Sequence, residues 1–105
     1  MRRDMAKHRQ TKATDISPAV KKAVWERDCE CCIICGSIYA APEAHYIPRS
    51  AGGLGVEQNI VTLCRACHDL FHREVEWVKL AVRDYLQSKY PDWDEKKLYY
   101  KKYDF

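Results

Sequence analysis

The fold follows from residues 32–72, which read CIICGSIYAAPEAHYIPRSAGGLGVEQNIVTLCRACHDLFH. Two Cys-x-x-Cys pairs lie at the ends of this segment, Cys32 with Cys35 and Cys64 with Cys67. The two residues inside each pair allow both sulfurs to face one tetrahedral ion, and two such pairs complete a closed four-sulfur zinc site of the structural kind. We therefore predict one structural zinc ion held by these four cysteines.

The ligands of the first pair have competitors, because Cys29 and Cys31 lie just before it. Cys29 is also separated from Cys32 by two residues, so it competes with Cys35. Gly36 follows Cys35, and its conformational freedom suits the tight turn of a zinc knuckle. We therefore favour Cys32 with Cys35 and predict that Cys29 and Cys31 are free thiols.

Two short strands and a helix are expected between and after the cysteine pairs. Residues 44–47 can form the first strand, and the apolar, β-branched run 59–63 can form the second. The connection over 48–57 contains three glycines and is long enough to wrap beside a bound backbone. The helix is expected over 64–72.

Further helices are predicted on both sides of this unit. Ser17 followed by Pro18 is typical of a helix start, and apolar positions carry the helix to residue 27 or 28, with Trp25 anchored on the core. An amphipathic pattern predicts another helix over 74–89, ended by the proline that follows, and a small helix is expected over 94–100.

The central block resembles the HNH endonuclease family, also called the ββα-metal nucleases. The resemblance implies an α+β fold class: a small ββα-metal fold with structural zinc knuckles, flanked by N-terminal and C-terminal helices. Two flanking runs, WERD at 25–28 and YPDW at 90–93, resemble small phage HNH proteins. The residues that match the family pattern are Cys32, Cys35, His45, Pro48, Gly52, Gly53, Asn59, Leu63, Cys64, Cys67 and His68.

Histidines in this block suit the hydrolysis of a phosphodiester. A neutral imidazole can take a proton from water near pH 7, and His45 is the expected general base. His68 and His72 are four residues apart on the expected helix, so they share one face and can hold a second, catalytic ion. By the resemblance, His68 is the final metal-binding histidine, and Asn59 fixes the loop that poses His45.

One position departs from the family pattern. Many members place Asp or His, an ion ligand, immediately before the base, and here that residue is Ala44. Either Glu43 or His72 can replace the missing ligand, and Glu43 lies on the same side of a strand as His45. The other consequence is a changed metal preference or weak activity.

The resemblance implies a metal-dependent endonuclease that nicks or cuts DNA. The catalytic ion is expected to be magnesium, manganese, nickel, cobalt or zinc. A phage origin and a link to DNA packaging through a terminase are also implied. The alternative is a non-catalytic, zinc-stabilised DNA-binding or adaptor protein, which Ala44 favours.

Composition and charge indicate one small domain. The 105 residues divide into a basic flexible tail over 1–15 and a nuclease domain with a helical extension over 16–105. The net charge is +3, and positive residues gather near the amino end. These residues either contact DNA phosphates or form a solvated tail. The DNA-contact candidates are Arg2, Arg3, Lys7 and Arg9 in the tail and Arg49 after the first strand.

The sequence also carries expectations about location and assembly. It has no apolar run of the roughly 20 residues that cross a bilayer and no secretory signal. A cytoplasmic protein is therefore expected, in the host cytoplasm if it is phage-encoded. A monomer or a dimer is compatible with the pattern.

Overall fold

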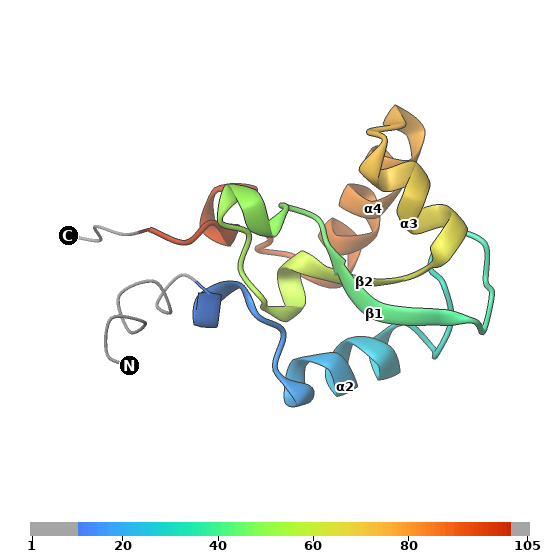
Figure 1. Cartoon of the computed structure of the whole chain (residues 1–105), viewed down its shortest axis with the longest axis horizontal. Helices are drawn as coiled ribbons and strands as arrows, with labels where there is room; N and C mark the ends of the chain where they lie inside the picture. Colours follow the sequence, from blue (N-terminus) through green and yellow to red (C-terminus); the bar gives the residue numbers. More distant parts are fainter. Residues whose placement is uncertain (1–10, 102–105) are drawn as a thin grey trace.

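The computed structural model describes residues 11–101 and shows a mixed α+β architecture. Strands β1 (Ala40–His45) and β2 (Ile60–Cys64) form a two-stranded antiparallel sheet. Helix α2 (Pro18–Arg27) lies on one side of this hairpin, and helices α3 (Arg65–His72) and α4 (Glu76–Lys89) lie on the other (Figure 1). The predicted fold class is confirmed.

Helix α2 starts as the sequence predicts. Pro18 occupies its first turn, and the Ser17 side chain accepts a hydrogen bond from the backbone N–H of Val20 at 3.1 Å. The expected core anchor is different, however. Val24 is fully buried whereas Trp25 is only half-buried, because adjacent helical residues diverge by roughly 100° and one of them must turn from the sheet.

Both strands are displaced from their expected positions. The first strand was expected over 44–47 but begins at Ala40, because Ala40 pairs with Cys64 at the second knuckle. It ends at His45, which pairs with Ile60, and the chain then leaves the ladder. The second strand starts one residue later than expected, because Asn59 closes a 3₁₀ turn (Glu57–Asn59).

The two helices after the hairpin begin later than predicted. Cys64 is the N-cap of α3 rather than its first residue. Glu74 adopts a left-handed backbone with φ of 60°, which separates α3 from α4 and moves the start of α4 to Glu76. Helix α4 then buries Val78, Val82 and Leu86 against the sheet side of the core.

A buried ion pair joins the end of α2 to the second strand. Asp28 is 4% exposed and accepts hydrogen bonds from the Thr62 N–H at 2.8 Å and the Tyr85 hydroxyl at 2.6 Å. Its partner Arg27 donates to Asp28 at 2.7 Å and to the Ile60 carbonyl at 2.7 Å. These bonds fix α2, β2 and α4 as one unit.

Residues 11–15, placed in the flexible tail by the sequence analysis, are packed against the domain. Residues 11–14 are helical, and Thr14 is 3% exposed. They dock on the loop between the strands, where the Gly55 N–H donates to the Ala13 carbonyl at 2.9 Å. That loop contains a 3₁₀ turn (Arg49–Ala51), and another 3₁₀ turn (Glu95–Leu98) follows α4.

None of the helices within residues 11–101 has the length and apolar character needed to cross a membrane.

Candidate active site

The four predicted zinc ligands are brought together. The sulfur atoms of Cys32, Cys35, Cys64 and Cys67 all lie within 4.8 Å of one another. The competing thiol Cys29 is exposed and lies outside this group, as does Cys31. The predicted ligand set is therefore confirmed as a group that can hold a metal ion.

The knuckle backbones prepare the sulfurs for a cation. The Ile34 N–H donates to Cys32 Sγ and the Cys67 N–H to Cys64 Sγ, both at 3.4 Å. Burial raises the pKa of Cys32, but the surrounding backbone N–H groups outweigh it and lower that pKa from 9.0 to about 7. A backbone N–H lowers the pKa of Cys35, but neighbouring thiols outweigh it and raise that pKa, and burial raises the pKa of Cys67, so without a cation the four sulfurs are not all thiolates. Four sulfurs in one group are a donor set that fits tetrahedral zinc.

A cavity of about 400 Å³ is lined by the predicted general base and the candidate ligands of the catalytic ion, whereas the predicted catalytic residue Asn59 is buried and does not line it. Its wall includes His45 and Glu43 from β1, and His68 and His72 from α3. The strand places Glu43 and His45 on one side, as alternation predicts. Residues that are far apart in the sequence therefore share one pocket.

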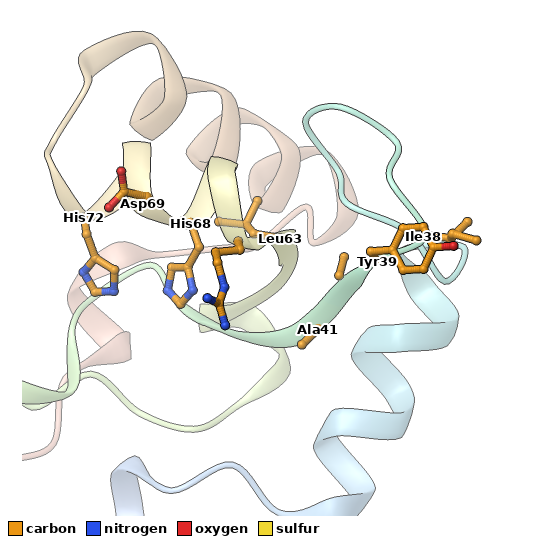
Figure 2. Close-up of a pocket in the computed structure, with 9 residues that line it drawn as sticks. Ile38, Tyr39, Ala41, Leu63, His68, Asp69 and His72 are labelled. Carbon is orange, nitrogen blue, oxygen red and sulfur yellow. The ribbon is translucent and has the colours of Figure 1, made fainter.

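The two helix histidines lie side by side. The ring centroids of His68 and His72 are 4.5 Å apart and the rings are stacked. Figure 2 shows both side chains projecting from α3 in the same direction. Burial, followed by the charge of His72, lowers the pKa of His68 below its usual 6.5. A neutral imidazole has a free lone pair, so this environment keeps His68 ready to bind a cation near neutral pH.

The candidate ligands of the catalytic ion, Glu43, His68 and His72, do not form a group as compact as that of the four cysteines. Within residues 11–101, the four cysteines form the only group of three or more possible ligands with mutual distances under 4.8 Å. Glu43 pairs with Lys21 at 3.3 Å at the edge of the pocket. Ala44 is 1% exposed and packs in the core, so it adds nothing to the pocket.

Asn59 fixes the loop that follows β1. It is fully buried, and its Nδ2 donates to the carbonyls of Leu54 at 2.8 Å and Ile47 at 3.2 Å. Its backbone carbonyl accepts from the Tyr46 N–H at 2.7 Å, one residue beyond His45. The loop and the end of β1 are thus tied to one side chain.

His45 is half-buried and has a specific partner. Its Nε2 lies 2.8 Å from the carbonyl oxygen of Thr14, which can only accept, so Nε2 carries the proton. Burial is the largest influence on this ring and lowers its pKa below 6.5. The neutral ring leaves Nδ1 as its open acceptor. Nothing in the sequence of residues 11–15 signals this contact.

Arg49 also contacts the amino-terminal segment 11–15. Its guanidinium forms an ion pair with the Asp15 carboxylate, and both side chains are about half exposed, at 53% and 52%. The other DNA-contact candidates, Arg2, Arg3, Lys7 and Arg9, lie outside the described residues.

An open groove of about 700 Å³ borders the histidine pair on its other side. Its far end carries Ile38 and Tyr39, which are 69% and 84% exposed (Figure 2). His68 and His72 line both depressions, so they stand where the pocket and the groove meet.

Comparisons with known proteins agree with the central block. Residues 32–77 match the model of a family described as HNH endonuclease, which confirms the resemblance over that segment. A protein named Anaredoxin, from Nostoc sp. (strain PCC 7120 / SAG 25.82 / UTEX 2576), is 37% identical over 43 residues. That alignment covers 40% of this chain and 57% of the relative. No solved structure matches significantly.

Proposed function

We propose that this protein is a metal-dependent endonuclease that hydrolyses DNA phosphodiester bonds. The observation that carries the proposal is that His45 from β1 and the stacked pair His68 and His72 from α3 line one pocket. It lies within a segment that matches the HNH endonuclease model. A general base and imidazole ligands in one pocket supply groups that phosphodiester hydrolysis with a divalent ion uses.

The chain's own residues take the following parts. His45 removes a proton from water, whose oxygen bonds to phosphorus while the bond to the 3′ oxygen breaks; that oxygen then takes a proton from solvent. His68 and His72, with Glu43, would hold the divalent ion. When bound, this ion reduces the charge on the phosphate and stabilises the departing oxygen. Asn59 keeps the loop and the end of β1 in place for this step.

The four cysteines hold a zinc ion that stabilises the fold rather than reacts. In a chain of 105 residues the core is small, so metal binding supplies part of the folding free energy. Four sulfurs leave no open coordination position for substrate. Four sulfurs also bind iron, and the relative's name, Anaredoxin, makes metal analysis of the purified protein a necessary check.

The second candidate function is a non-catalytic, zinc-stabilised DNA-binding or adaptor protein. It is favoured by the spread of Glu43, His68 and His72, which do not form a compact ligand group in residues 11–101, and by Ala44. A role in phage DNA packaging beside a terminase rests only on the resemblance of the flanking runs. Action in the host cytoplasm, as a monomer or a dimer, belongs to the same proposal.

Plasmid nicking separates the two candidates. Zinc-loaded protein is incubated with supercoiled plasmid and magnesium, manganese, cobalt, nickel or zinc, and binding is followed in parallel by gel shift. The endonuclease produces open-circular DNA with at least one metal. Binding without nicking under all five metals supports the adaptor protein instead.

A further inference from the structure

The segment 11–15 lies outside residues 32–77, the part that matches the family model, yet it contacts two residues of the pocket. The Thr14 carbonyl accepts a hydrogen bond from His45 Nε2 at 2.8 Å, and the Asp15 carboxylate pairs with Arg49. Neither Thr14 nor Asp15 lines the cavity itself. The segment therefore contacts these two side chains without forming part of the pocket wall.

We propose that residues 11–15 are a positioning element of the active site: the Thr14 carbonyl holds the His45 ring so that Nδ1 takes the proton from water. This inference rests on the proposed endonuclease function. A carbonyl accepts hydrogen bonds only, so Nε2–H is fixed and the lone pair of the neutral ring is on Nδ1. After proton transfer the ring carries both N–H groups, and the same carbonyl stabilises its positive charge.

Hydrogen bonds within residues 11–15 and close contact with Gly55 hold this segment in place beside His45. The Thr14 hydroxyl donates to the Thr11 carbonyl at 3.2 Å, and the Asp15 N–H donates to the same carbonyl at 2.8 Å. Gly55 allows a very close approach, because a Cβ there would lie 2.0 Å from the Asp15 carbonyl oxygen and 3.0 Å from that of Thr14. Any residue larger than glycine at position 55 must therefore displace the segment.

The test uses the full-length, zinc-loaded protein and three variants. Gly55→Ala displaces the segment through the added Cβ, and Asp15→Asn weakens its attachment to Arg49. Asp84→Asn is the matched control, because the one ion pair of Asp84 among residues 11–101 is a long, exposed contact with Arg83 on α4, at 3.9 Å. Zinc content and circular dichroism establish that each variant is folded.

The first readout is the His45 Nε2–H proton in ¹⁵N-labelled protein. A hydrogen-bonded, half-buried N–H exchanges slowly enough to be observed, whereas a ring N–H open to water does not. We expect this signal in the wild type and in Asp84→Asn, and its loss in Gly55→Ala. Absence of the signal from the wild type would overturn the Thr14 contact, whether or not the protein cuts DNA.

The second readout is the rate of plasmid nicking. Loss of a group that orients a reacting side chain typically costs about 10- to 100-fold, so kcat of Gly55→Ala should fall by about that factor while KM changes little. Asp15→Asn should show a smaller fall in kcat. This second variant tests the same role if Gly55→Ala does not fold. Unchanged or faster nicking in a folded variant that has lost the signal contradicts the positioning role. If the wild type shows the signal but nicks no DNA, the proposed function fails and the Thr14–His45 contact stands.

Discussion

The side-chain amide of Asn59 is bonded to the backbone of Ile47 through both of its polar groups: Oδ1 accepts from the Ile47 N–H at 2.8 Å, and Nδ2 donates to the Ile47 carbonyl at 3.2 Å. Ile47 follows β1 by two residues, so this pairing replaces the strand ladder where the ladder stops. The position of the Asn in the family pattern thus has a local physical reason.

Asn59→Ala should destabilise the domain, because it leaves the buried N–H and carbonyl of Ile47 and the partly buried carbonyl of Leu54 without the Asn59 side chain. Each such group costs about 1–3 kcal/mol. Urea unfolding of the zinc-loaded protein measures the loss. Gln58→Ala, at an exposed neighbouring position, is the control and should change the free energy of unfolding by less than about 0.5 kcal/mol. Equal stability of the two variants would contradict the role assigned to Asn59.

Asp28→Ala should cost about 3–5 kcal/mol, because it leaves the Arg27 charge without its carboxylate in a buried site. It also removes the acceptor of the Thr62 N–H. The control is Asp84→Ala, whose exposed pairing with Arg83 should contribute about 0–1 kcal/mol. Denaturant midpoints of the two variants, measured at constant zinc concentration, compare their stabilities. A similar loss of stability in both would show that the buried pair contributes no more than the exposed one.

The cysteine assignments are tested by metal content. Cys35→Ser and Cys64→Ser should lose the zinc and yield insoluble or unfolded protein, because metal binding is coupled to folding here. Cys29→Ser and Cys31→Ser, outside the sulfur group, should fold and keep one zinc per chain. Plasma emission spectrometry after dialysis gives the stoichiometry. Loss of zinc from Cys29→Ser together with its retention in Cys35→Ser would reverse the assignment.

The pH dependence of nicking should show a base that remains neutral under mildly acidic conditions. Burial lowers the pKa of His45 from 6.5, so its neutral form persists as the pH falls through 6.5 and is lost only below it. The acid limb of kcat/KM, which reports the free enzyme, should therefore lie below pH 6.5. The divalent ion must be saturating at each pH, because protons compete for histidine ligands. An acid limb above 6.5 would contradict the burial argument.

Local rules in the sequence were sufficient for the four-cysteine group, the start of α2 and the order of α2, β1, β2, α3 and α4. Cys-x-x-Cys spacing and a Ser-Pro helix start act over a few residues, so they can be recognised without the fold. The predicted limits of β1 were wrong because they depend on contacts between residues that are distant in the sequence. Ala40 pairs with Cys64 at the start of the strand, and beyond its end the Ile47 N–H bonds to the Asn59 side chain. In the sequence, Arg27 and Asp28 could be recognised only as part of the WERD run at 25–28. Their hydrogen bonds to Ile60 and Thr62 could not be predicted from it.

The amino-terminal contact is the largest feature that sequence reasoning did not predict. Residues 11–15 have no apolar periodicity, and short charged ends are usually mobile. Their docking depends on Gly55, which permits backbone contact, and on His45, which supplies a donor. Both belong to other segments, so neither could be inferred from the tail itself. The gathering of His45, His68, His72 and Glu43 around one pocket likewise became visible only in three dimensions.

His45→Ala and His68→Ala are compared in one plasmid assay, together with calorimetric titration of the catalytic ion into zinc-loaded protein. A base acts on water and a ligand acts on the metal, so the two losses should differ. His45→Ala should bind the ion like the wild type and nick about 100- to 10,000-fold more slowly, whereas His68→Ala should lose both the ion and activity. DNA affinity should change little in either variant, because lysine and arginine provide most of the phosphate neutralisation. If His45→Ala nicks as fast as the wild type, or the wild type nicks with none of the five metals, the account is contradicted.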